Sequence, residues 1–204
     1  MRRGLMVITM LLGLLPLTSY AANYYVSKAS GASDSNNGTS QTFVSGTNGP
    51  WLTLGKVASV NFSAGDTVSF RCGDTWTGEQ FTTVSTGGSS DSNRLTFTNY
   101  GTCTGANRPI FNFTGQTWGA IFTDKNWITV DGLEMHSSFN EVFNVGLQTS
   151  SGTSTGFTIK NSRFHTTTDT SGSSPTRAIV SLLNFVWGTG SPIAEGHLTN
   201  LLLE

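Results

Sequence analysis

Charged residues, cysteine and proline are all scarce in this chain of 204 residues. Only 11% of the residues are charged, and the formal net charge is −1. A chain with so little positive charge lacks what binding to a phosphate backbone requires, so we expect no nucleic-acid partner. Strongly helix-forming stretches are scarce too, whereas Gly, Ser, Thr and Asn are abundant. This composition is typical of short strands joined by polar turns, and it predicts an all-β fold.

A long apolar run occurs only at the start of the chain. Arg2 and Arg3 precede an apolar stretch from Leu5 to Leu17, which is short for a membrane span, and small residues follow around Ala21. This is the pattern of a secretory signal peptide, predicted over residues 1–22. We therefore expect a secreted or periplasmic protein, with no membrane segment once the signal peptide is removed.

The two cysteines of the chain are Cys72 and Cys103. Each follows a stretch with the alternation of a strand, and the signal peptide places both in an oxidising compartment. We expect a Cys72–Cys103 disulfide that closes a loop of about 30 residues. Two buried free thiols are the alternative.

An internal repeat lies between Asn126 and His165. When the chain is shifted by 29 residues (from 130 to 159), apolar, corner and polar positions coincide. Four matched pairs define the repeat: Val130–Ile159, Gly132–Asn161, Met135–Phe164 and His136–His165. Each copy is a short strand, a corner residue that tolerates a left-handed backbone, and a second strand. Such a unit is one coil of a solenoid, in which each coil stacks on the next.

The outward positions of the repeat carry opposite charges. Asp131 matches Lys160, and Glu134 matches Arg163. Opposite charges on neighbouring strands stabilise a sheet by roughly 0.2–1 kcal/mol per pair. We therefore expect charged ladders on the surface of the solenoid.

Two further coils precede the repeat. Val68 and Phe70 match Leu95 and Phe97 at a spacing of 27 (from 68 to 95), and Phe97 matches Val130 at a spacing of 33 (from 97 to 130). The loops vary in length while the strands keep their pattern. We expect nine residues to point inward: Val68, Phe70, Leu95, Phe97, Ile128, Val130, Met135, Ile159 and Phe164.

Residues 121–122 and 143–147 are candidates for the third strand of their coils. After His165 the pattern weakens, residues 178–183 are a candidate for another strand, and the chain reaches Glu204 in mid-coil. A last coil without a cap exposes apolar side chains and strand edges, so we expect residues 178–204 to be the least ordered part of an aggregation-prone chain.

The stretch Pro50–Ser59 has the best helical pattern after the signal peptide. Trp51, Leu54 and Val57 recur at helical spacing, and proline suits a position in the first turn. A short amphipathic helix at this point would cover the open end of the first coil.

Six short motifs lie between Tyr24 and Ile110, within a resemblance that covers about residues 23–165. They are YYVS from Tyr24, SDSNNGTS from Ser33, PWLTL from Pro50, AGDTV from Ala64, GDTW from Gly73, and YG from Tyr100 with RPI from Arg108. Together they resemble the amino-terminal part of secreted right-handed parallel β-helix proteins of the pectate-lyase-like superfamily, many of which are polysaccharide-active enzymes. The resemblance implies an all-β, right-handed parallel β-helix with a short amino-terminal capping helix, truncated at its carboxyl end.

Three segments follow from this comparison: a signal peptide over residues 1–22, a strand, loop and capping helix over 23–66, and β-helix coils over 67–204 with the last coil incomplete. The implied function is that of a polysaccharide lyase or glycoside hydrolase in a longer parent, with this chain weak or inactive alone. Its expected partner is a polysaccharide, an acidic one if the protein is a lyase. The alternative is a non-catalytic β-helix that binds glycans or mediates surface adhesion.

A polysaccharide lyase needs a cation that neutralises the uronate carboxylate and a base that removes the neighbouring proton. The catalytic candidates are Lys160, Arg163 and Glu134, for which surface ladders are the structural alternative. The histidines His136 and His165 could stack and bind a metal, although the sequence supplies no third ligand.

Other residues are candidates for binding. Exposed tryptophans form platforms for sugar rings, and the candidates are Trp76, Trp118 and Trp127, the last with core or corner packing as an alternative. Asp34 and Asn36 lie in a polar run similar to a calcium loop, which makes calcium a candidate cofactor. A turn rich in Asx hydrogen bonds is the alternative for that run.

Overall fold

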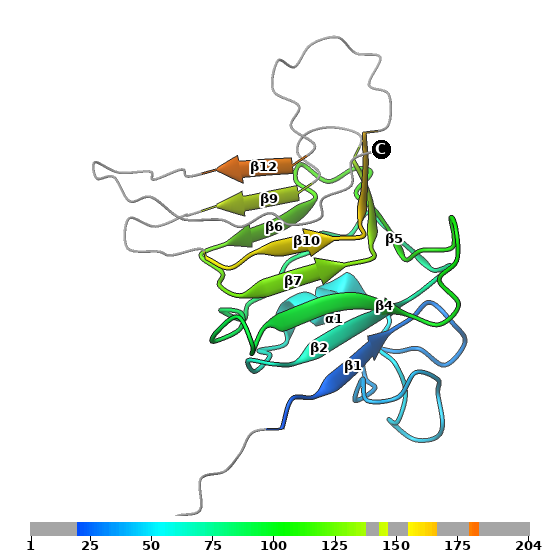
Figure 1. Ribbon diagram of the computed structural model, residues 1–204. Helices are drawn as coiled ribbons and strands as arrows, with labels where there is room; N and C mark the ends of the chain where they lie inside the picture. The colour runs from blue at the N-terminus through cyan, green and yellow to red at the C-terminus, as the bar shows by residue number, and fades with distance from the viewer. Residues whose placement is uncertain (1–19, 138–142, 147–154, 167–179, 184–204) are drawn as a thin grey trace, which may run out of the picture.

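The computed structural model describes residues 20–137, 143–146, 155–166 and 180–183. Within these ranges the chain forms three parallel sheets and one short helix (Figure 1). The predicted signal peptide and most of the carboxyl-terminal segment lie outside the described residues. In the described part of the chain, no helix has the length and apolarity needed to cross a bilayer.

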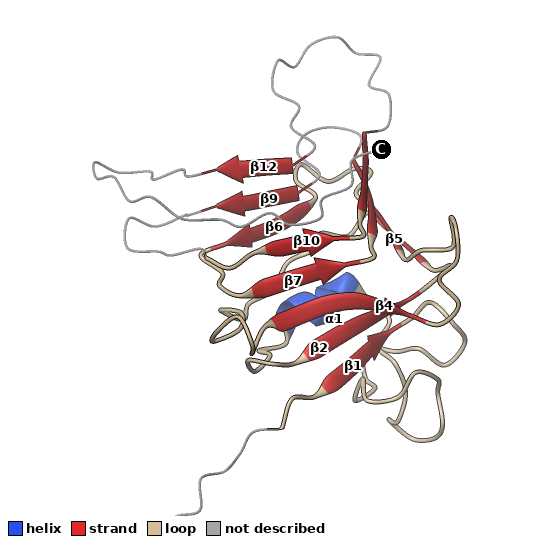
Figure 2. Cartoon of the chain, in the orientation of Figure 1, coloured by secondary structure: helices blue, strands red, loops and turns tan. Residues whose placement is uncertain are grey.

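Each sheet takes strands from successive passes of the chain (Figure 2). The five-stranded sheet has the order β1 (Asn23–Val26), β2 (Thr67–Arg71), β4 (Leu95–Tyr100), β7 (Ile128–Asp131) and β10 (Thr158–Lys160). The four-stranded sheet has the order β3 (Thr75–Thr77), β5 (Ile110–Asn112), β8 (Glu134–Ser137) and β11 (Arg163–Thr166). The three-stranded sheet has the order β6 (Ala120–Thr123), β9 (Phe143–Gly146) and β12 (Val180–Leu183).

The chain visits the three sheets in turn. It runs from β4 to β5 and β6, then from β7 to β8 and β9, and then from β10 to β11 and β12. Every pairing between these strands is parallel, and no sheet closes on itself within the described residues. The prediction of an all-β protein built of parallel strands is confirmed.

The register of the internal repeat agrees with the sequence pattern. Val130 pairs with Ile159, and His136 pairs with His165. Between β2 and β4 the predicted register was wrong by two residues, because Val68 pairs with Phe97 and not with Leu95. A shift of two residues keeps each side chain on the same face of a strand, so all nine residues expected to point inward are fully buried.

The helix is shorter than predicted. It covers only Leu54–Ser59 (α1), and the side chain of Thr53 caps it by accepting a hydrogen bond from the amide of Lys56 at 3.0 Å. Trp51 is extended, and it exchanges backbone hydrogen bonds of 2.9 Å with the edge of β1 through Tyr25 and Ser27. Tertiary pairing with β1 therefore overrides the helical spacing of the sequence at this point.

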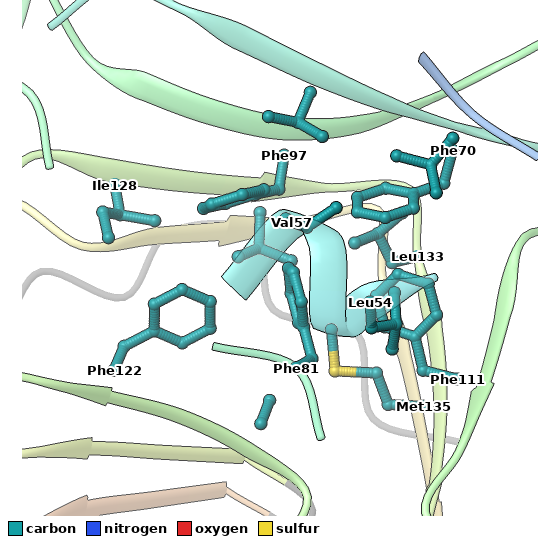
Figure 3. Close-up of a cluster of buried hydrophobic side chains, with 14 of the residues drawn as sticks. Leu54, Val57, Phe70, Phe81, Phe97, Phe111, Phe122, Ile128, Leu133 and Met135 are labelled. Carbon is teal, nitrogen blue, oxygen red and sulfur yellow. The ribbon is translucent and has the colours of Figure 1, made fainter. Parts of the chain in front are cut away.

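Aromatic rings fill the space between the sheets (Figure 3). The ring of Phe81 makes edge-to-face contacts with four others, at centroid distances of 4.8 Å to Phe111, 5.1 Å to Phe97 and Phe122, and 5.8 Å to Phe70. Pairs of this geometry add about 0.5–1.5 kcal/mol beyond their burial. Residues of α1 are buried in the same cluster, which joins the helix to the coils.

The predicted disulfide is present. Cys72 and Cys103 are bonded, with their Cα atoms 5.3 Å apart and a sequence separation of 31. The bond ties the end of β2 to the loop that follows β4.

Candidate functional site

The outer face of the four-stranded sheet gathers polar side chains from four coils. The inner face of this sheet carries Trp76, Phe111, Met135 and Phe164, which lie in register and are fully buried. Successive side chains of a strand point to opposite faces, so the residues on either side of these four point outward. We call this surface the polar face, and its residues are Thr75, Thr77, Asn112, Glu134, His136 and Arg163.

A carboxylate and an imidazole meet at the centre of the polar face. Glu134 and His136 lie two residues apart on β8, an inner strand between β5 and β11. Glu134 Oε1 lies 2.7 Å from His136 Nε2, and the side chains are 11% and 25% exposed. Glu134 was expected in an exposed ladder, but it is buried, and the neighbouring imidazole offers its carboxylate a hydrogen-bond partner.

Two arginines lie where strands of this sheet begin. Arg163 on β11 is the register neighbour of Glu134 and is half-buried. Arg108 precedes β5 and donates through Nη1 to the carbonyl of Asn161. The Nε atom of Arg108 is buried and has no hydrogen-bond partner among the described residues. Since the amide of Glu134 donates to the carbonyl of Pro109 at 3.0 Å, Arg108 lies beside the carboxylate strand.

Lys160 lies on a different sheet from the other two catalytic candidates. Its Nζ is 3.4 Å from Asp131 Oδ2, and both residues belong to the five-stranded sheet. Asn161 adds a 2.9 Å hydrogen bond from Nδ2 to the other oxygen of Asp131. The structure therefore brings Glu134 and Arg163 together on the four-stranded sheet, and it places Lys160 on the neighbouring five-stranded sheet.

The three tryptophans differ in exposure. Trp76 is fully buried and donates from Nε1 to the carbonyl of Leu52 at 2.9 Å, so its ring faces no solvent and the expected sugar platform is wrong there. Trp127 is half-buried, with the Arg94 guanidinium 5.4 Å from its ring centre and the backbone of Gly156 packed against the ring. Trp118 is 42% exposed, in the loop between β5 and β6.

The polar run near the amino terminus is held by Asx hydrogen bonds. Asp34 accepts from the amides of Leu52 and Thr53 at 3.0 Å and from the hydroxyl of Thr53 at 2.6 Å. Asn36 donates to the carbonyls of Gly31 and Pro50 at 2.9 Å. These bonds explain both side chains without calcium, and no group of three metal-ligating side chains occurs among the described residues.

Arg108 had not been identified as a functional candidate from the sequence. It belongs to a loop of irregular length after Cys103, and no repeat position matches it. Its place beside Asn161 follows from the stacking of coils and has no counterpart in the local sequence pattern.

Comparison with known proteins supports the fold only. No known family profile matches the chain, and no curated protein matches it. The fold is similar to that of a GH136 lacto-N-biosidase from Eubacterium ramulus, with TM-scores of 0.53 for its selenomethionine derivative and 0.51 for the native protein. The sequence identity is 12%, and each match covers 71% of this chain. The chain spans about a third of the length of that protein, with 34% covered.

Proposed function

We propose that this protein is a secreted, carbohydrate-active right-handed parallel β-helix that binds a polysaccharide on its polar face. The observation that carries the proposal is the grouping of Glu134, His136 and Arg163 on the outer face of the four-stranded sheet. The fold of a lacto-N-biosidase supports a carbohydrate ligand, and the disulfide fits an oxidising compartment.

The proposed organisation has a signal peptide over residues 1–22, an amino-terminal unit over 23–66 and coils over 67–204. Two contacts support the role of the amino-terminal unit as a cap. The strand β1 extends the five-stranded sheet beside β2, and the helix α1 buries Leu54 and Val57 in the shared core.

The proposed substrate is an acidic polysaccharide, and the proposed reaction is that of a lyase. Arg163 and Arg108 supply two guanidinium groups near a carboxylate-bearing strand, and a guanidinium binds a carboxylate through paired hydrogen bonds. A uronate held in this way has its charge neutralised, which makes the proton next to the carboxylate easier to remove.

A non-catalytic role in glycan binding or surface adhesion is the second candidate. The ion pair between Lys160 and Asp131 favours it, because it leaves one of the three catalytic candidates engaged between neighbouring coils of the five-stranded sheet. Product analysis separates the two, since a lyase forms an unsaturated product that absorbs in the ultraviolet and a binder forms none.

Affinity electrophoresis of the full chain against acidic and neutral polysaccharides tests the proposal. We expect retardation by at least one acidic polysaccharide, and we expect Arg163→Ala to weaken it about tenfold or more, because a hydrogen bond to a charged group contributes about 1.5–3 kcal/mol. Thr98→Ala, on the outer side of the five-stranded sheet, is the matched control and should bind as the wild type does. Equal binding by Arg163→Ala, or no retardation by any polysaccharide, would overturn the proposal.

A further inference from the structure

We propose that Glu134 and His136 form a catalytic dyad, in which His136 moves the proton and Glu134 positions its imidazole. This inference rests on the proposed function and identifies the residues that would make the protein an enzyme rather than a binder. The two side chains meet at 2.7 Å between Oε1 and Nε2, on the central part of the polar face.

Differences in burial separate the two roles. Glu134 is nearly buried, whereas a quarter of the His136 side chain is exposed. A buried carboxylate that holds one nitrogen of an imidazole fixes the orientation of the ring and stabilises the imidazolium that forms when the ring takes a proton. The more exposed member is then the one that substrate touches.

The other candidates fit the role of proton carrier less well. Arginine keeps its proton in proteins, so Arg163 is suited to hold a carboxylate and not to act as a base. Lys160 belongs to the five-stranded sheet, and its Nζ lies 3.4 Å from Asp131 Oδ2. Among the side chains of the polar face that the structure describes, His136 is titratable and partly exposed. It lies two residues along β8 from Glu134, the register neighbour of Arg163.

The proposed step is a β-elimination on a uronate whose carboxylate lies on Arg163. The C5–H bond breaks and its proton goes to His136 Nδ1, the nitrogen opposite the one that Glu134 holds. The electron pair of that bond forms the C4=C5 double bond as the C4–O4 bond breaks. The imidazolium then returns the proton to the departing oxygen, so the dyad ends in its starting state and no further reactant is needed.

Kinetics of four variants test the dyad in the full chain. We expect His136→Gln to lower kcat by about 10²–10⁴-fold, the usual contribution of a positioned acid or base, with polysaccharide binding retained. His136→Gly should regain part of its turnover when free imidazole is added, which a purely structural histidine would not show. Glu134→Gln should lower kcat with little change in KM, and Glu134→Asp should recover part of the loss.

Controls separate failure of the dyad from failure of the proposed function. Thr98→Ala should have wild-type turnover, and the melting temperature of each variant shows whether it folds. Full turnover by His136→Gln, or no imidazole rescue in a folded His136→Gly, would refute the dyad while the proposed function stands. If the wild type binds polysaccharides and forms no product, the dyad is also refuted and the protein is a binder.

A measurement without substrate covers the case in which no polysaccharide is bound and the proposed function itself fails. In ¹⁵N-labelled protein the dyad predicts a downfield imidazole N–H proton on Nε2 of His136 that Glu134→Gln moves upfield. A signal that this substitution leaves unchanged would show that Glu134 does not hold the ring, and it would overturn the inference by itself.

Discussion

Gly132 and Asn161 turn the chain from the five-stranded to the four-stranded sheet in consecutive coils. Both have a left-handed backbone, with φ of 73° and 51°. Their match in the sequence was sufficient to predict the corner, because few residues other than Gly, Asn and Asp adopt this conformation readily. The sequence did not reveal that Gly132 also packs against Asn99, whose Nδ2 donates to the Gly132 carbonyl at 2.8 Å.

Gly132→Ala should lower the free energy of unfolding by about 1–3 kcal/mol, since the new side chain meets a left-handed backbone. The added Cβ would also clash with Asn99 Nδ2, so Asn99 must move. Asn161→Gly is the control: it keeps the corner without strain and loses only the exposed bond to Asp131, so we expect a change below about 1 kcal/mol. Urea denaturation measures both, and equal stability of wild type and Gly132→Ala would contradict this account of the corner.

Tyr100 makes the stability of the fold depend on pH at the alkaline end. Burial raises the pKa of its phenol above the ordinary value of 10.0, and its hydroxyl donates to the carbonyl of Gln41 at 3.1 Å. The folded state therefore keeps the proton at a pH where the unfolded chain loses it. Stability is unaffected below about pH 10 and falls as the pH rises from there through the raised pKa.

Tyr100→Phe should reduce this alkaline loss, leaving the part due to Tyr24, whose pKa burial also raises. At neutral pH the variant should be slightly less stable, because it lacks the bond to Gln41. Urea denaturation at a series of pH values from neutral to alkaline measures the slope. A slope as steep in Tyr100→Phe as in the wild type would show that another group is responsible.

Among the elements, the strands were predicted better than the helix. Strand alternation places Val68 and Phe70 inside whichever of two registers is chosen, so burial was predicted correctly while the register was wrong by two residues. The helix was predicted to begin at Pro50, but the pairing of Trp51 with β1 delays it to Leu54. Neither the register nor that pairing is encoded in local spacing, because both depend on contacts between distant segments.

The capping of α1 gives a prediction at this scale. Thr53→Ala removes the hydroxyl that accepts from Lys56 and donates to Asp34, so we expect a loss of about 0.5–2 kcal/mol in unfolding free energy. Thr53→Ser retains the hydroxyl and should lose much less. Thermal unfolding of the two variants measures the difference, and equal melting temperatures for Ala and Ser would contradict the capping role.

At the scale of the whole molecule, the sequence predicted stacked parallel strands and the disulfide, but only part of the candidate site. Glu134 and Arg163 were identified from opposite charges in matched positions. The burial of Glu134, its contact with His136 and the place of Arg108 could not be predicted, because they depend on how the sheets meet at the corner. Trp76 was misassigned because alternation within a strand of three residues does not say which face is inside.

The polar face is the proposed binding site of the polysaccharide. A crystal structure of the protein with an acidic oligosaccharide from the best-binding polymer tests it most directly. The account predicts sugar density across β5, β8 and β11, with a carboxylate on Arg163 and a ring carbon near His136. Density instead on the outer side of the five-stranded sheet, or beside Trp118 with the polar face empty, would contradict it.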